Sequence, residues 1–172
     1  GTGKSTVAAA VAAAVGIKHI DLDAEIERAE GRSVSQLFTE RGERAFRDLE
    51  ALHVERMLSE HSACVVALGG GTVTRERTRR RLLQNGVVVT LRAPIEELGR
   101  RLQGATDRPL LNGRDATAAL RELLDERRAA YAESHVTLDA TRDPASIARD
   151  VLADAAQPPI LVALGERSYP IV

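Results

Sequence analysis

Short apolar runs alternate along this chain with longer stretches in which apolar residues recur at helical spacing. The apolar runs are bounded by turn residues, which is typical of buried strands. We expect strands at residues 17–22, 64–68, 87–91 and 136–139. We expect helices at residues 7–15, 24–30, 34–41, 43–60, 75–84, 94–102, 116–134 and 144–155. Because strand and helix alternate, the pattern predicts an α/β fold with a parallel sheet.

Two segments depart from this alternation. Residues 103–114 contain Gly104, Pro109 and Gly113, and they predict a mobile loop. Towards the end of the chain, residues 156–159 include two prolines and predict a linker, after which residues 160–164 have the apolar weight of another strand. We therefore expect one domain over residues 1–155 and the start of something else at 160–172.

Composition narrows the class of protein. The 172 residues are 44% hydrophobic but only 2% aromatic, so a single core of Ala, Leu, Val and Ile is expected. Lys and Arg number 24 against 25 Asp and Glu, which gives no global positive charge to attract a nucleic acid. No segment predicts a membrane span or a signal peptide, so a cytoplasmic location is the default expectation.

Two local features have plain structural interpretations. Cys64 is the only cysteine and lies in an apolar run, so we expect a buried side chain and no reactive thiol. Five arginines gather between residues 75 and 81, without interleaved aromatic residues. We interpret this run as a solvated helix face, although a charge run can also mark a nucleic-acid site.

The first residues carry the strongest chemical signal. They match the second half of the Walker A motif, whose first glycine would lie five residues before Gly3 and so upstream of Gly1. The predicted nucleotide-binding residues of this segment are Gly1, Thr2, Gly3, Lys4, Ser5 and Thr6. Lys4 can reach the β and γ phosphates of ATP, and the Ser5 hydroxyl can ligate Mg²⁺. The alternative is an ordinary turn before a helix. We expect the given sequence to begin inside the phosphate loop, after the strand that would anchor it.

Two carboxylates follow, with Asp21 seventeen residues beyond Lys4. At positions i and i+2 of a strand end, Asp21 and Asp23 would point the same way and face the phosphate loop. The alternative is that one of them caps the helix that follows.

Together these features resemble the shikimate kinase family, and the resemblance covers residues 1–155. It implies a P-loop NTPase fold of the nucleoside-monophosphate-kinase type, with three α/β/α layers and a first strand missing from this sequence. It also implies ATP and Mg²⁺ as cofactors and shikimate as the substrate. Within the family's pattern, Asp21 would help to hold Mg²⁺, and Asp23 would contact shikimate hydroxyls and act as the candidate base.

Two further segments carry the resemblance. Phe46 to Glu50 is similar to the family's Phe-Arg-x-x-Glu segment, which implies that Arg47 binds the shikimate carboxylate and that Glu50 orients Arg47. The plain alternative is an exposed ion pair between Arg47 and Glu50 on a solvated helix. The triple glycine matches the family's glycines that approach the substrate closely; its residues are Gly69, Gly70 and Gly71.

The lid and the last arginines complete the pattern. Arg108 lies in an Arg-Pro-Leu-Leu segment that resembles the family's lid over ATP, and a lid arginine can neutralise the transferring phosphoryl group. Arg127 and Tyr131 resemble an Arg-x-x-x-Tyr element whose arginine is a second ligand of the shikimate carboxylate. Arg128 is adjacent, so the assignment between the two arginines stays open. The resemblance also places two residues beside adenine, Arg101 and Pro144.

The sequence thus predicts Mg²⁺-assisted, in-line transfer of the γ-phosphoryl group of ATP to shikimate, with Lys4, Asp23 and Arg108 as the catalytic residues. The rival functions are another small-molecule P-loop kinase, acting on gluconate or a nucleotide, and a non-catalytic nucleotide-binding regulator. Residues 160–171 resemble the first strand of 3-dehydroquinate synthase. That likeness predicts covalent fusion to such a synthase, while a terminal extension is the simpler alternative.

Overall fold

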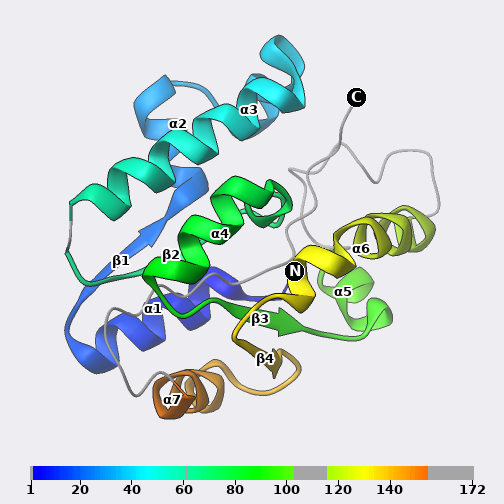
Figure 1. Ribbon diagram of the computed structural model, residues 1–172. Coiled ribbons are helices and arrows are strands. Elements are labelled where there is room, and N and C mark those ends of the chain that lie inside the picture. Colours follow the sequence, from blue (N-terminus) through cyan, green and yellow to red (C-terminus); the bar gives the residue numbers. More distant parts are fainter. Residues whose placement is uncertain (1, 61, 103–115, 155–172) are drawn as a thin grey trace.

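The computed structural model describes residues 2–60, 62–102 and 116–154 (Figure 1). Strands and helices alternate along the chain as the sequence predicts. The elements are α1 (Lys4–Val15), β1 (Lys18–Asp21), α2 (Leu22–Glu30), α3 (Val34–Ser59), β2 (Cys64–Ala67), the 3₁₀ helix η1 (Thr72–Thr74), α4 (Glu76–Asn85), β3 (Val89–Arg92), α5 (Ile95–Leu102), α6 (Ala116–Ala132), β4 (Val136–Asp139) and α7 (Pro144–Asp154). The predictions for Gly1, Arg108, the loop at 103–114 and residues 156–172 lie outside the described residues.

The strands pair in parallel, which confirms the prediction. β1 lies beside β2 with Asp21 opposite Ala67, and β3 lies beside β4 with Arg92 opposite Asp139. Because β1 and β2 run in the same direction, the residues that follow them leave the sheet at the same edge. The segments after Asp21 and after Ala67 are therefore neighbours, and they carry the candidate site.

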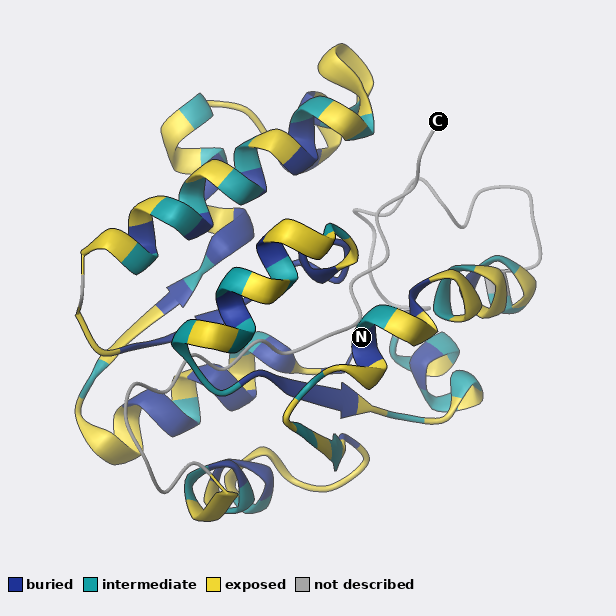
Figure 2. Ribbon diagram, viewed as in Figure 1, coloured by how far each residue is buried: buried dark blue, intermediate teal, exposed yellow. Residues whose placement is uncertain are grey.

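Helices cover both faces of the strands, giving the three expected layers (Figures 1 and 2). Alternate residues of β2 point to opposite sides, since side chains alternate along a strand. Val66 packs in one core cluster with side chains of α2, α3 and α4, and Val65 packs in the other with side chains of α1 and α7. β2 is buried along its whole length and β3 along most of it, which explains the continuous apolar runs at these two strands.

Two details of single residues bear on the predictions. Helix α3 joins the two helices that we expect on either side of Gly42, whose φ of 77° and ψ of 167° interrupt the helical backbone. Cys64 is buried and free of disulfides, and burial raises the pKa of its thiol, as its apolar surroundings predict. Across the described ranges, the model contains no helix with both the length and the apolar content that crossing a membrane requires.

Candidate active site

Helix α1 begins directly after Gly3, which adopts a left-handed conformation with φ of 80°. Glycine tolerates this conformation and carries no side chain that would occupy the first N–H groups of the helix. Those N–H groups and the positive end of the helix dipole favour a bound anion. Lys4, at the first helical position, is only 3% exposed. A buried cation beside a helix N-terminus fits the phosphate site that the sequence predicts.

Ser5 and Asp21 form the next part of the site. The Ser5 hydroxyl donates a hydrogen bond of 2.6 Å to Oδ2 of Asp21. The other oxygen of Asp21 accepts from the backbone N–H of Ala24 at 3.4 Å, so Asp21 also caps α2. Asp21 thus contacts the phosphate loop and caps a helix at the same time. A hydroxyl and a carboxylate side by side are the oxygen ligands that Mg²⁺ prefers.

The structure corrects the expected placement of Asp23. We expect Asp21 and Asp23 to share one face of a strand, but β1 ends at Asp21 and Asp23 lies in the first turn of α2. The strand stops there because the Asp21 side chain caps a helix that begins at Leu22. Asp23 is 3% exposed, and its carboxylate faces the glycine loop that follows β2.

Gly69 provides the space for this carboxylate. A β-carbon at residue 69 would lie 2.7 Å from Oε1 of Glu50 and 3.0 Å from Oδ1 of Asp23. A side chain at this position would therefore displace the Glu50 carboxylate and press against that of Asp23. Asp23 of α2 and Glu50 of α3 therefore converge on one point of the loop after β2.

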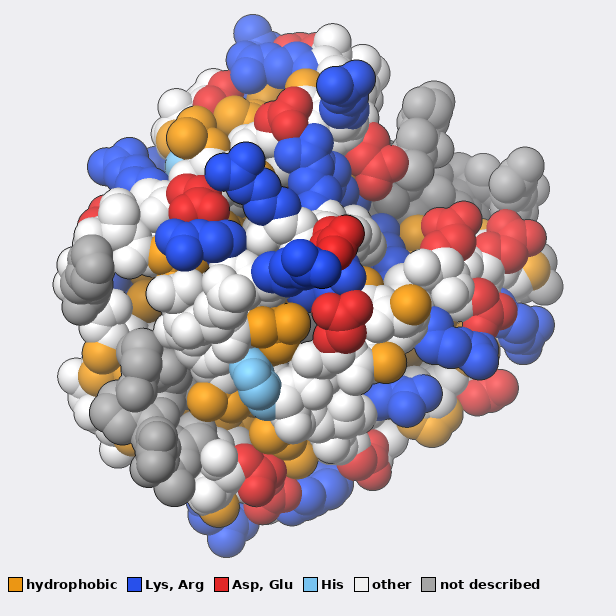
Figure 3. All heavy atoms as spheres, viewed as in Figure 1, with side chains coloured by type: hydrophobic (Ala, Val, Ile, Leu, Met, Phe, Trp, Pro, Cys, Tyr) orange, Lys and Arg blue, Asp and Glu red, His pale blue; other side chains and the backbone are white. Residues whose placement is uncertain are grey.

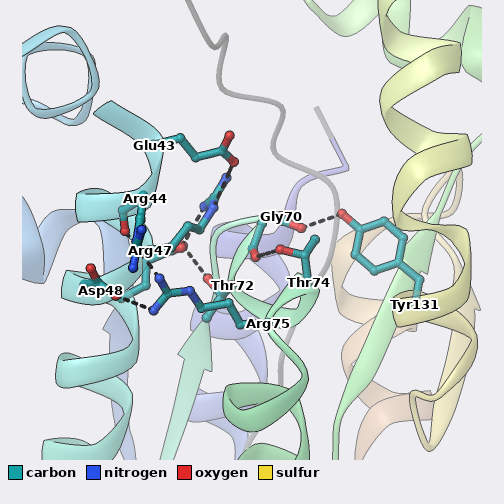
Figure 4. Close-up of polar contacts among 11 residues, drawn as sticks. Glu43, Arg44, Arg47, Asp48, Gly70, Thr72, Thr74, Arg75 and Tyr131 are labelled. Atoms are coloured by element: carbon teal, nitrogen blue, oxygen red, sulfur yellow. Dashed lines mark hydrogen bonds and ion pairs between the residues drawn. The ribbon is translucent and has the colours of Figure 1, made fainter. Parts of the chain in front are cut away.

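Arg47 is the cation of this cluster, and its side chain is 6% exposed while that of Glu50 is 1% exposed. Its Nη1 donates to Glu50 at 2.6 Å. Its Nη2 donates to Glu43 at 2.9 Å, as Figure 4 shows. The guanidinium carbon also lies 5.6 Å from the ring centre of Phe38 and 5.7 Å from that of Phe46. The burial rules out the alternative of an exposed ion pair.

Burial and ion pairing shift the pKa values of Glu50 and Arg47. Burial raises the pKa of Glu50, and the neighbouring Asp23 adds to that effect, while Arg47 and the Thr72 hydroxyl oppose it. Burial alone would lower the pKa of Arg47, but Glu50 and Glu43 raise it above its ordinary value. Burial therefore sets the direction of the pKa shift of Glu50, and ion pairing sets that of Arg47. Thr72 donates to Glu50 at 2.5 Å, which fixes the carboxylate between two donors.

The other two glycines of the loop contact further parts of the site. A β-carbon at residue 71 would lie 2.0 Å from the guanidinium carbon of Arg47. The carbonyl oxygen of Gly70 accepts a hydrogen bond of 2.8 Å from the hydroxyl of Tyr131, on α6 (Figure 4). The loop is therefore the meeting point of α2, α3 and α6. Gly69 and Gly71 leave space for side chains of α2 and α3. The sequence alone does not show this need for glycine.

Arg127 lies one turn before Tyr131 on α6 and is 5% exposed. Arg128 differs sharply, because its side chain is 78% exposed and pairs with Asp125. A buried arginine suits a ligand for an acidic substrate better than a solvated one. The geometry therefore favours Arg127 over Arg128.

Comparison with known proteins now decides the family. The family model described as shikimate kinase matches residues 1–156 of this chain. The chain belongs to the shikimate kinase family. The shikimate kinase of Caulobacter vibrioides (strain NA1000 / CB15N) is 39% identical over 155 residues, which are 90% of this chain and 77% of the relative.

Two solved structures of the shikimate kinase family share the fold. The shikimate kinase from Acinetobacter baumannii in complex with shikimate superposes with a TM-score of 0.82 at 34% identity, covering 88% of this chain and 85% of that one. The shikimate kinase from Bacteroides thetaiotaomicron also gives a TM-score of 0.82, at 29% identity, covering 89% of this chain and 92% of that one. The expected P-loop α/β kinase fold is confirmed.

The two residues that the shikimate kinase pattern places beside adenine both border the connection between β4 and α7. Arg101 on α5 donates from Nη1 to the carbonyl oxygen of Ala140 at 3.0 Å. Pro144 begins α7 a few residues further along the same connection, and Asp143 accepts from the backbone N–H of Ser146 to cap that helix. Glu97 accepts from Arg101 and from Arg100, which lowers the pKa of Glu97 to about 2.

Sequence reasoning missed three residues that make contacts around the candidate site. Thr72 binds Glu50, Glu43 binds Arg47, and Arg79 ties α4 to other elements. Glu43 precedes Arg47 by one helical turn, so helical spacing could have suggested that pair. Thr72 and Arg79 contact residues far along the chain, and no local pattern reveals such partners. In the part of the chain that is described, no cluster of three or more His, Cys, Asp or Glu side chains is placed to hold a metal.

Proposed function

We propose that this chain transfers the γ-phosphoryl group of ATP to a hydroxyl group of shikimate. The observation that carries the proposal is the convergence of Asp23 and the Arg47–Glu50 pair on Gly69, at the edge where β1 and β2 end. An acid that can accept a proton and a buried cation that can bind a carboxylate thus lie beside a phosphate loop. Family membership and the shikimate-bound structure of a relative support this reading.

Asp23 is the proposed base of the reaction. It accepts the proton of the acceptor hydroxyl while that oxygen forms a bond to the γ-phosphorus of ATP. The bond from the γ-phosphorus to the bridging oxygen breaks in line, and ADP leaves. Asp23 suits this role because it is buried and only two residues from Asp21, which contacts the phosphate loop through Ser5.

The phosphate end is assigned to Lys4, Ser5 and Asp21. Lys4 and the first N–H groups of α1 bind the phosphates, and Ser5 with Asp21 would hold Mg²⁺. When bound, Mg²⁺ neutralises charge on the β and γ phosphates. Thr2, Gly3 and Thr6 complete the described part of the phosphate loop, and Gly1 belongs to the same proposal. Arg108 is proposed to cover the transferring group from the lid.

The carboxylate end is assigned to Arg47 and Arg127. Glu43 occupies the Nε and Nη2 edge of Arg47, and its side chain is 32% exposed, whereas Glu50 is enclosed. We infer that the carboxylate of shikimate replaces Glu43 at this edge, while Glu50 keeps the guanidinium in place. Two parallel N–H donors then match the two oxygens of the substrate. Arg101 and Pro144 are proposed to border the adenine ring.

A substrate panel tests the proposal. ADP release is measured with shikimate, gluconate and nucleoside monophosphates, each at the same Mg²⁺ and ATP concentrations. We expect turnover with shikimate alone. Turnover of gluconate or of a nucleotide without turnover of shikimate would replace the proposed substrate. ATP binding without phosphorylation of any acceptor would be the signature of a nucleotide-binding regulator.

We also propose that residues 160–172 begin a second domain that resembles 3-dehydroquinate synthase, joined through the linker at 156–159. The match to the kinase family model ends at residue 156, which supports a boundary there. Translating the coding frame beyond residue 172 is the test. An NAD-binding synthase domain in that frame is the expected result, and a stop codon directly after residue 172 would refute the fusion.

A further inference from the structure

Arg79 differs from the other arginines of α4 in being largely enclosed, with a side chain that is 12% exposed. It binds Glu133 through two bonds, from Nε at 2.7 Å and from Nη2 at 2.9 Å. Its Nη1 donates to the carbonyl oxygen of Val73 at 2.9 Å. The expectation that the whole arginine run is a solvated face is therefore wrong for Arg79, because Glu133 after α6 and Val73 of η1 supply acceptors that the local sequence does not show.

The rest of the run fits the expectation better. Arg80 pairs with Glu76, and both side chains are more than 60% exposed at 68% and 63%. Arg81 pairs with Glu55 of α3, and both side chains are more than 40% exposed at 43% and 41%. Figure 3 shows basic and acidic side chains interspersed on this face of the molecule, with no continuous positive surface. Exposed pairs of this kind contribute little to stability.

Three bonds from one guanidinium connect separate elements. Val73 belongs to η1, which directly follows the triple glycine, and Glu133 lies directly after the end of α6. Arg79 therefore ties the end of α6 to the segment that carries the glycine loop. Tyr131 makes a second tie between the same parts, since its hydroxyl binds the carbonyl oxygen of Gly70 at 2.8 Å. Arg79 and Tyr131 line one small cavity, together with Gly69, Val73 and Ser134.

These ties bear on Arg127 because of where it lies on α6. The first half of α6 packs on α5, through a cluster of Leu98, Leu120 and Leu124. The last turn is attached to the glycine loop by Tyr131 and Glu133. Arg127 lies between the two attachments, one turn before Tyr131 and on the same face. A change in the last turn would therefore shift Arg127, which lies four residues before Tyr131 on the same helix.

We propose that Arg79 is a positioning residue, which acts with Tyr131 to fix the end of α6 on the glycine loop and so sets the place of Arg127 in the acid-binding site. The proposal rests on the proposed function, because the effect concerns binding of the substrate carboxylate. Bidentate recognition demands accurate placement, and a shift of about 1 Å is enough to weaken it severely. Arg79 is suited to the task because its planar fork binds in three directions at once.

The test compares Arg79→Gln with Arg81→Gln in the full chain. Both changes remove one positive charge from the same helix and break a bond to a glutamate, but Arg81 contacts α3. We expect Arg79→Gln to raise the KM for shikimate by about tenfold and to leave the KM for ATP unchanged. Arg81→Gln should leave both constants unchanged. Equal KM values for shikimate in the two variants would overturn the proposal.

A double-mutant cycle separates positioning from general loosening. In an Arg127→Ala background, Arg79→Gln should cause no further rise in the KM for shikimate, because the side chain that it positions is gone. A full tenfold rise in that background would also overturn the proposal. Arg79→Lys keeps the charge but not the fork, so we expect it to resemble Arg79→Gln. Restoration of the normal KM by lysine would mean that charge alone matters.

The attachment of the last turn of α6 can be measured separately from activity. Amide hydrogen exchange in the last turn of α6 should be faster in Arg79→Gln and in Tyr131→Phe than in Arg81→Gln. Unchanged exchange would refute the attachment whether or not the chain acts on shikimate. Absence of shikimate turnover by the unmodified chain would instead refute the proposed function. The two failures are thus told apart.

Discussion

The guanidinium group of Arg47 packs directly on Gly71, so closely that a β-carbon at residue 71 would lie 2.0 Å from its central carbon. The backbone of Gly71 has φ of −91° and ψ of −14°, which any residue adopts. Glycine is therefore required here for space and not for backbone freedom. The loop after β2 and the arginine of α3 therefore have to fit each other.

Gly71→Ala should displace Arg47 without straining the loop backbone. We expect the KM for shikimate to rise about tenfold or more, since a hydrogen bond to a charged group contributes on the order of 1.5–3 kcal/mol. Steady-state kinetics measure this. Gly99→Ala is the matched control, because a β-carbon there meets nothing within 4 Å and α5 favours alanine over glycine. An unchanged KM in Gly71→Ala would contradict the assignment of Arg47.

Two substitutions separate the cap that Asp21 makes on α2 from its proposed role in holding Mg²⁺. Asp21→Asn keeps a side chain that can cap α2 but removes the charge that would help to hold Mg²⁺. We expect it to keep the stability of the chain and to need a higher Mg²⁺ concentration for half-maximal turnover. Asp21→Ala should show the same Mg²⁺ effect and also lose about 1 kcal/mol of unfolding free energy. Equal unfolding free energies of the two variants would show that the cap contributes nothing.

Glu50 should make stability depend on pH. Burial raises the pKa of Glu50 above its ordinary value of 4.5, so the folded state binds the proton more tightly than the unfolded state. The contribution of Glu50 to the unfolding free energy is fully present below pH 4.5. It is lost as the pH rises through the raised pKa of the folded state. Glu50→Gln cannot titrate and lacks this dependence.

Urea unfolding of both proteins from pH 4.5 upwards measures the effect. The variant keeps Glu43 as a charged partner of Arg47. Because only the unmodified chain loses a proton at residue 50, its unfolding free energy should fall relative to that of Glu50→Gln as the pH rises. A difference between the two unfolding free energies that does not change with pH, or that moves in favour of the unmodified chain, would contradict the raised pKa.

Much of this fold is predictable from the sequence, because β2 and β3 lie in compact apolar runs and Gly16, Gly31 and Gly42 mark helix boundaries. The parallel pairing follows from the alternation of strands and helices. The placement of Asp23 on a helix was missed, because it depends on Asp21 capping α2, and the sequence does not decide between that cap and a longer strand.

The long-range contacts were beyond local patterns. Arg79 looks like one charge in a basic run, and only its contact with Glu133, 54 residues away, shows that it is enclosed. The space beside Gly69 and Gly71 is likewise filled by side chains of other helices. Motifs thus indicate which residues matter, while tertiary packing decides what each of them contacts.

The most direct measurement is the turnover of shikimate by Asp23→Asn compared with the unmodified chain. Asparagine keeps the size of the side chain but cannot accept the proton of the attacking hydroxyl. We predict that kcat falls by about 10²- to 10⁴-fold while the KM for ATP is unchanged. Turnover of shikimate at the normal rate in Asp23→Asn would contradict the account.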